Sequence, residues 1–288
     1  MGFRTVVIKN RAKLEYSLNY LVVRGEEEIK IPLSDINTLL IQNIQTCITS
    51  ALIAKLIESK IKLIFCDEKN NPSSELVGYY QNYSNFTKIC LQINWTNEIK
   101  NYLWQKIIIQ KIFTEIKLLE FLNKTEQIDK MKDYLNNVQL GDITNREGHA
   151  AKVYFNSLFG RDFSRGSDNC LNKYLNYGYS IIASNINREI KCDGYLTEIG
   201  IHHIGETNPF NLTYDFIESL RAIVDYYVNC KNIDEVNYKT ILNSILSFKV
   251  RYNGNEMFLE NAIHLYVLNL INFLNGKNKE IIFIDYEF

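Results

Sequence analysis

The chain changes its hydrophobic periodicity once, and this change restricts the folds that it can adopt. Residues 5 to 40 contain short runs rich in β-branched and aromatic side chains, separated by the turn-forming residues Asn10, Gly25, Pro32 and Asp35. This pattern is typical of a compact antiparallel sheet. From about Phe86 onward the apolar residues recur at helical spacing. We therefore predict an α+β protein, with a small N-terminal antiparallel β domain followed by a larger all-α C-terminal domain.

One helix and one further strand complete the predicted β domain. The helix is expected from Ser50 to Lys60 and the strand from Lys62 to Cys66. The polar segment from Asp67 to Glu75 combines Asn, Pro and Ser residues, which favours a linker. We therefore expect domains at residues 1–75 and 76–288. The tail, residues 280–288, is expected to form a short strand, a fold-back or an interface segment.

Composition excludes several classes of protein. With 46% hydrophobic residues and three prolines, the chain is expected to be globular. Its six cysteines form no C-x-x-C pair, so neither a zinc ribbon nor a disulfide framework is indicated. No charged leader with an apolar core opens the chain, and no run reaches the roughly eighteen apolar residues of a membrane span. We expect a cytoplasmic protein without membrane contact.

Charge is balanced, at 32 basic and 33 acidic residues, so the sequence is not typical of a dedicated nucleic-acid coat. Any DNA-binding surface must then be local. Ordinary solvated charges remain the alternative for most of the basic residues taken singly. The candidates for DNA contact are Arg146, Lys152, Arg161 and Arg165, with Arg188, Arg221, Lys249 and Arg251 as further members.

The segment from His202 to Arg221 sets an imidazole ahead of two carboxylates, as many divalent-metal sites do. Asp215 and Glu218 are three residues apart, so on a helix they point the same way. The helix is expected to start near Asn208 and Pro209 or at Asn211. His203 lies twelve and fifteen positions before the two acids. Alone, the histidine would more often be a core or loop residue, and the acids a solvated face or an ion pair with Arg221.

Glu147 is a third candidate acid. It shares a helix face with Ala151, Tyr154 and Leu158, and an acid aligned with an apolar stripe must be paired, hydrogen-bonded or bound to metal. The alternative is a capping box, because Thr144 stands three residues before it. The presence of the downstream histidine and acids favours the metal-binding interpretation.

Three blocks carry a resemblance to a known family. They are REGHAAKVYF from Arg146, LNKYLNYGYSII from Leu171, and GIHH with NPFNLTYDFIESLR from Gly200. In this order and spacing they resemble the CRISPR-associated integrase, the endonuclease-like subunit of the spacer-acquisition complex in antiviral defence, in the form found in type II systems. GFRTVVIKNRAKL, IPLSDINTLLI, TSALIAKL and IKLIFCDEKNNPS also resemble the amino-terminal domain of that family. The resemblance covers essentially the whole chain.

The resemblance implies a ligand set for Mg²⁺ or Mn²⁺. The glutamate of the first block, the histidine of the GIHH block and an acid of the following helix fall on Glu147, His203 and Glu218. Asp215 is then an additional or water-mediated ligand, or a group that orients His203 or Arg221. The family's usual E-P-F-R-P reads ESLRA here, and the lost prolines are expected to alter the helix end. The second block is expected to serve packing through Gly178, with Tyr179 or Asn172 as alternatives that line the site.

The implied reaction joins a short DNA duplex to a CRISPR array. Its 3′-OH ends attack the repeat borders in a transesterification that needs no ATP. The resemblance also implies a homodimer, two of which flank a dimer of a small ferredoxin-like partner in a heterohexamer, with further type II subunits. The β domain would supply the dimer and partner contacts. The alternatives are a generic metal-dependent nuclease and a non-catalytic DNA-binding scaffold.

Overall fold

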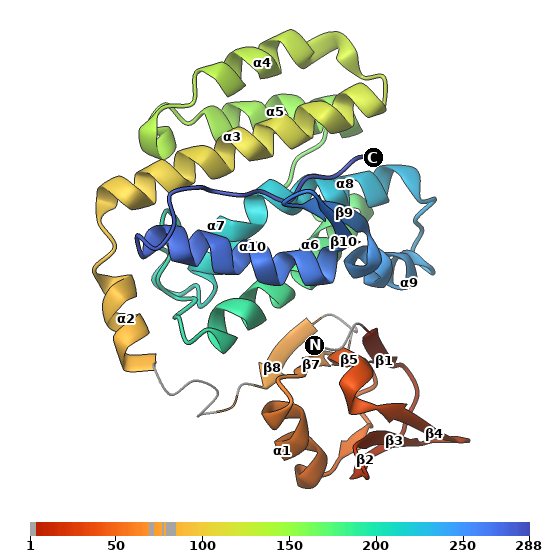
Figure 1. Ribbon diagram of the computed structural model, residues 1–288. Helices are drawn as coiled ribbons and strands as arrows, with labels where there is room; N and C mark the ends of the chain where they lie inside the picture. The colour runs from red at the N-terminus through yellow and green to blue at the C-terminus, as the bar shows by residue number, and fades with distance from the viewer. Residues whose placement is uncertain (1–3, 69–71, 77, 79–84) are drawn as a thin grey trace. The chain divides into compact units, whose positions relative to one another are not determined.

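The computed structural model describes residues 4–68, 72–76, 78 and 85–288 (Figure 1). The chain divides into two compact units, Met1–Ser84 and Asn85–Phe288. The first is rich in strands and the second in helices, which confirms the predicted fold class.

The first sheet of the N-terminal unit is mostly parallel. Its strand order is β1-β5-β7-β8, in which β1, β5 and β7 run parallel and β8 is antiparallel. The strands are β1 (Arg4–Ile8), β5 (Ile36–Ile41), β7 (Lys62–Cys66) and β8 (Pro72–Leu76). Helix α1 (Ser50–Glu58) lies in the crossover from β5 to β7, the connection that parallel strands require. All six residues of β5 are buried, as in a strand covered on both faces.

The second sheet has the order β4-β3-β2-β6. Strands β2, β3 and β4 form an antiparallel meander, and β6 pairs with β2 in parallel. The strands are β2 (Lys13–Ser17), β3 (Tyr20–Arg24), β4 (Glu28–Pro32) and β6 (Cys47–Ile48), and the short helix η1 (Leu33–Asp35) follows β4. The expectation of a single antiparallel sheet is therefore correct only for this meander, because periodicity identifies a strand but not its partner.

The segment predicted to be a linker is partly a strand. Residues 69–71 lie outside the described residues, but Pro72–Leu76 forms β8 and pairs with β7. The ammonium of Lys62, on the neighbouring strand, lies 3.6 Å from Glu75 Oε2. The polar composition therefore reflects an edge strand whose acid neutralises a buried lysine. The predicted boundary after residue 75 falls within β8, and the compact units divide after Ser84.

The second unit is built from nine described helices and one hairpin. The helices are α2 (Asn85–Ile93), α3 (Asn97–Phe121), α4 (Ile128–Asn136), α5 (Arg146–Phe159), α6 (Cys170–Cys192), α7 (Asn211–Ile217), α8 (Arg221–Cys230), α9 (Tyr238–Asn243) and α10 (Leu259–Leu274). Short 3-10 turns are η2 (Thr125–Gln127), η3 (Leu140–Asp142), η4 (Glu218–Leu220) and η5 (Ser244–Ser247).

The hairpin of β9 (Lys249–Tyr252) and β10 (Asn255–Phe258) departs from the predicted all-α domain. Its turn is Asn253-Gly254, and both residues have positive φ. Asn-Gly between short strands is a strong hairpin signal, because both central residues of such a turn must adopt positive φ. The Asn253-Gly254 pair in the sequence therefore already indicated this hairpin.

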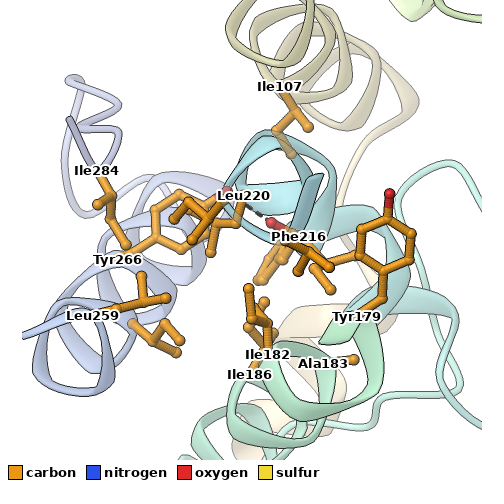
Figure 2. Close-up of a cluster of buried hydrophobic side chains, with 14 of the residues drawn as sticks. Ile107, Tyr179, Ile182, Ala183, Ile186, Phe216, Leu220, Leu259, Tyr266 and Ile284 are labelled. Carbon is orange, nitrogen blue, oxygen red and sulfur yellow. Dashed lines mark hydrogen bonds between the residues drawn. The ribbon is translucent and has the colours of Figure 1, made fainter. Parts of the chain in front are cut away.

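The core of the helical unit holds the turn that carries Glu218. Figure 2 shows Ile107 of α3, Phe216 of α7 and Tyr266 of α10 among the buried side chains around this turn. The Tyr266 hydroxyl lies 3.0 Å from Ser219 Oγ and donates to the Phe216 carbonyl at 3.0 Å. Tyr286 donates to the Ser219 carbonyl at 2.9 Å. Buried hydrogen bonds thus fix the backbone on both sides of Glu218.

Gly178 serves packing, as the sequence indicated. A Cβ atom at this position would lie 2.4 Å from Val224 Cγ1, so α6 and α8 approach each other too closely for any side chain.

The C-terminal tail is a fold-back. Asp285 exchanges backbone hydrogen bonds with Arg251 of β9, and Tyr286 is buried.

The described ranges contain no helix that combines the length and the apolar character needed to cross a membrane.

Helices α6 and α10 are joined by an ion pair that depends on pH. His264 Nδ1 lies 2.8 Å from Glu189 Oε2, and this hydrogen bond raises the pKa of His264 above its usual 6.5. Because the native state favours the charged imidazole, the pair stabilises fully below pH 6.5 and loses its effect as pH rises through the raised native pKa. We therefore expect His264→Gln to lower the melting temperature more at about pH 5.5 than at about pH 8.5. Equal losses in calorimetry at both values would contradict this.

Candidate active site

The buried carboxylate of Asp215 organises the loop that carries the two histidines. Its Oδ2 accepts the backbone N–H groups of Ile201 at 2.6 Å and His202 at 3.2 Å, and its Oδ1 accepts that of His203 at 3.0 Å. The loop approaches the acid closely because residue 200 is glycine. A Cβ there would lie 2.6 Å from Asp215 Oδ2 and 2.4 Å from the His203 carbonyl oxygen.

Asp215 also orients the ring of His203. The Nδ1 atom lies 2.7 Å from Asp215 Oδ1, and this hydrogen bond raises the pKa of His203. Because Nδ1 is engaged, Nε2 is the ring nitrogen that can bind a ligand. The neighbouring His202 stacks on Trp104 instead, with ring centroids 4.1 Å apart. Of the roles considered for Asp215, the structure supports the one that orients His203.

The carboxylates of Glu147 and Glu218 both bind the ammonium of Lys111, a residue that was not predicted from the sequence. The Lys111 ammonium lies 2.6 Å from Glu218 Oε2 and also bonds Glu147 Oε1. Lys111 lies on α3, Glu147 on α5 and Glu218 in η4. The side chains of Lys111 and Glu218 are 7% and 6% exposed, whereas that of Glu147 is 31% exposed. The centre is therefore mostly buried, with Glu147 on its accessible side.

Arg221 completes the charge balance of this centre. Its Nε and Nη2 atoms lie 2.8 and 2.7 Å from Glu218 Oε1, so both nitrogens contact the same carboxylate oxygen. Burial by itself would raise the pKa of Glu218, but Arg221 and Lys111 outweigh it and hold this pKa at about 2. Burial likewise opposes the charge of Lys111, and Glu218 and Glu147 raise its pKa above the usual value. Both acids are therefore paired with buried cations.

The helix start that positions Glu147 is capped by other residues. Asn145 is the N-cap of α5 and has positive φ. Asp142 accepts the backbone N–H of Arg146 at 2.8 Å and that of Glu147 at 2.9 Å. Thr144 Oγ1 has no hydrogen-bond partner within the described residues. The capping-box interpretation is therefore wrong, and the Glu147 carboxylate reaches Lys111 because Asp142 satisfies the helix N-terminus.

Tyr179 packs against Arg221 and shares the carboxylate of Asp225 with Tyr154. Tyr154 and Tyr179 donate to the buried carboxylate of Asp225 at 2.7 and 2.5 Å. The guanidinium of Arg221 lies 4.6 Å from the Tyr179 ring centroid, a cation–π contact. Tyr179 thus borders the centre through Arg221, whereas Asn172 bonds Ser164, Ser167 and Arg165 at the start of α6.

The residues fit a divalent cation by their chemistry. No group of three or more His, Cys, Asp or Glu lies in a metal-binding arrangement in the described part of the chain. Two carboxylates nevertheless converge on one positive charge, that of Lys111, and oxygen ligands of this kind suit Mg²⁺ and Mn²⁺. Glu147 and Glu218 would hold such an ion, with His203 Nε2 as the third donor.

The predicted DNA-contact residues fall into three groups. Arg221 belongs to the centre itself, and Arg165 lies 5.3 Å from the Tyr179 ring centroid. Arg188 is buried and paired with Glu189, so it is not accessible to a nucleic acid. The others lie in α5, in the loop after it or in the β9 hairpin, and these are Arg146, Lys152, Arg161, Lys249 and Arg251.

The architecture is that of Cas1 structures and of a casposase. A chain titled "Casposase bound to integration product" matches with a TM-score of 0.79 and 19% identity over 97% of this chain and 92% of that one. A Cas1 protein from Thermotoga maritima matches with a TM-score of 0.75 and 14% identity over 95% and 98% of the two chains. At these identities the matches establish the fold.

The sequence then identifies the family. The family model "CRISPR associated protein Cas1" matches residues 5–251, so the chain belongs to the Cas1 family of CRISPR integrases and endonucleases. It is 34% identical to the CRISPR-associated endonuclease Cas1 of Neisseria meningitidis over 229 residues, which cover 79% of this chain and 75% of that protein. It is 27% identical to the CRISPR-associated endonuclease Cas1 1 of Francisella tularensis subsp. novicida, over 90% and 91%. The resemblance seen in the sequence is confirmed.

Proposed function

We propose that this chain is the integrase of CRISPR spacer acquisition, which joins the 3′-OH ends of a short DNA duplex to the repeat borders of a CRISPR array. The observation that carries the proposal is the convergence of Glu147 and Glu218 on one buried cationic position. These acids lie in separate elements, so the fold has to assemble this centre. Membership of the Cas1 family supports the choice of substrate.

The reaction is a transesterification. The 3′-oxygen of the incoming strand attacks a phosphodiester of the array, one P–O bond forms, and the bond to the 3′-oxygen of the array strand breaks. The number of phosphodiesters is conserved, so no ATP is needed. When bound at the centre, a Mg²⁺ or Mn²⁺ ion would polarise the phosphodiester and stabilise the charge that develops in the transition state.

The side chains of the chain have distinct parts in this reaction. Glu147 and Glu218 would hold the cation, and Arg221 fixes the orientation of Glu218 through the contacts of Nε and Nη2 with one carboxylate oxygen. Asp215 keeps Nδ1 of His203 engaged, which leaves Nε2 as the third donor. Because Arg221 already holds Glu218 in place, this carboxylate needs little reorientation before the reaction, as electrostatic preorganisation requires.

Integration of both ends of a fragment requires two active sites, so we propose a homodimer that binds double-stranded DNA. Two solved neighbours guide the assembly: a casposase bound to integration product, and a complex titled "Cas6-RT-Cas1--Cas2 complex". The latter matches with a TM-score of 0.71 and 17% identity, and this chain covers 35% of that chain. By analogy, two dimers flank a dimer of a small ferredoxin-like partner in a heterohexamer, with type II subunits added and contacts supplied by the β domain.

The second candidate is a metal-dependent DNA endonuclease, which the names of the curated relatives favour. The same centre would serve, with water in place of the 3′-OH as the nucleophile. The reaction would then end in a nick or a cut, without preference for duplex ends or repeat borders.

A strand-transfer assay tests the proposal. A labelled short duplex with free 3′-OH ends is incubated with a supercoiled CRISPR-array plasmid, the ferredoxin-like partner and Mn²⁺, with a chelator in the control. We expect labelled products joined at the repeat borders, and none after metal removal. Cleavage without joining would favour the endonuclease, and DNA binding without either product would favour a scaffold.

A further inference from the structure

The position between Glu147 and Glu218 is already occupied by a cation of the protein itself, the ammonium of Lys111. Lys111 holds Glu147 and Glu218 together at the position where the proposed function requires a divalent ion. An ammonium 2.6 Å from a carboxylate oxygen occupies the space in front of that oxygen, and its charge repels a divalent ion at the same position. The Lys111 ammonium therefore opposes the binding of a divalent ion between these two acids.

Glu115 lies one helical turn along α3 from Lys111. It is 2% exposed, and its Oε2 has no hydrogen-bond partner in the described part of the chain. Side chains four residues apart on a helix are neighbours, with Cβ atoms about 6 Å apart. Burial raises the pKa of Glu115 to about 8, which the charge of Lys111 opposes. A buried carboxylate oxygen without a hydrogen-bond partner is costly, so its place one turn from Lys111 calls for an explanation.

We propose that Lys111 is a displaceable internal counter-ion, which leaves Glu147 and Glu218 when a divalent cation binds and pairs with Glu115 instead. The proposal rests on the proposed function, because it assumes that these acids bind a metal. Lysine suits the exchange because its charge is compact and its four-carbon stem is flexible. An ammonium left unpaired in the interior would cost several kcal/mol. Glu115 makes the exchange favourable because the approaching charge of Lys111 lowers the pKa of Glu115, so that its carboxyl releases a proton and pairs with the ammonium.

This arrangement has two consequences. Without metal, Lys111 keeps the two acids from repelling each other, so the centre stays assembled. With metal, Lys111 becomes a competitor whose removal strengthens binding, and Glu115 becomes the acceptor whose removal weakens it. A lysine that merely stabilised the fold would not make Mn²⁺ binding tighter when it is removed.

The test is calorimetric titration of the full chain with Mn²⁺ alone, without DNA. We expect Lys111→Met to bind Mn²⁺ about tenfold more tightly than the wild type, and Glu115→Gln to bind it about tenfold more weakly. Glu115→Gln keeps the shape of a side chain that is already largely uncharged at neutral pH, so this variant should fold. Lys106→Met is the matched control, since it removes a lysine of the same helix whose ammonium lies over the Tyr102 ring.

The possible outcomes distinguish the proposed exchange of Lys111 from the proposed metal-dependent function. Unchanged or weaker binding by folded Lys111→Met, or unchanged binding by Glu115→Gln, would overturn the exchange while leaving the metal site intact. If Lys111→Met does not fold, Glu115→Gln alone decides. If the wild type and its Glu147→Gln variant bind Mn²⁺ equally, the acids are not ligands, and the exchange falls together with the metal-dependent function.

Discussion

Replacement of Glu147 with glutamine is expected to lower the rate of strand transfer by about a thousandfold, because the cation that we propose for this centre would stabilise the developing charge by several kcal/mol. The fold should survive the change. The Glu147 side chain is 31% exposed, and Lys111 retains Glu218 as a buried partner at 2.6 Å. A large loss of activity without loss of structure is the result that distinguishes a ligand from a structural acid.

The measurement is the initial rate of strand transfer, with circular dichroism to monitor the fold and gel filtration to monitor the proposed dimer. Glu98→Gln is a matched control. Glu98 is the second residue of α3 after the N-cap Thr96, as Glu147 is of α5 after Asn145, so both changes alter the same helix-dipole interaction. Wild-type activity in Glu147→Gln would remove this residue from the site. Equal losses in both variants would mean that the helix dipole, not the ligand, is responsible.

The fold was predictable to the level at which local sequence determines it. The change from strand-like to helical periodicity placed the β unit before the α unit, and β7 (Lys62–Cys66) has the bounds that were expected. Strand pairing was not predictable, because the β1–β5 and β5–β7 contacts join segments that are distant in the sequence. The consecutive apolar residues Leu39, Leu40 and Ile41 of β5 were a local sign of a strand buried on both faces, as in a parallel sheet.

The site was predictable where an acid or an imidazole belonged to a recognisable block. Lys111 was missed because the sequence analysis looked for buried charges among acids only. It shares a face of α3 with the buried residues Ile107 and Ile108. A charge on an apolar helix face must be paired, as was expected for Glu147. The partners of Lys111 are 36 and 107 residues away, so only the fold could identify them.

Replacement of Asp215 with asparagine is expected to destabilise the helical unit by about 3 kcal/mol and to reduce strand transfer. The carboxylate accepts three backbone N–H groups, of Ile201, His202 and His203, and the ring Nδ1 of His203. An amide nitrogen cannot accept, so it would face N–H groups that cannot reverse their direction. His203 would also lose the group that fixes its ring, a loss of about tenfold to a hundredfold in such sites.

Asp225→Asn is the matched control, since Asp225 is buried like Asp215 but accepts from the hydroxyls of Tyr154 and Tyr179. A hydroxyl can turn and accept from the new amide, so this change should cost about 1 kcal/mol. Urea unfolding gives the free energies, and strand transfer at saturating Mn²⁺ gives the activity. Similar destabilisation in both variants would show that the loss of stability comes from removing a buried charge and not from the unpaired backbone N–H groups. Full activity in a folded Asp215→Asn protein would mean that His203 needs no orienting acid, and the histidine would lose its assigned place as a ligand.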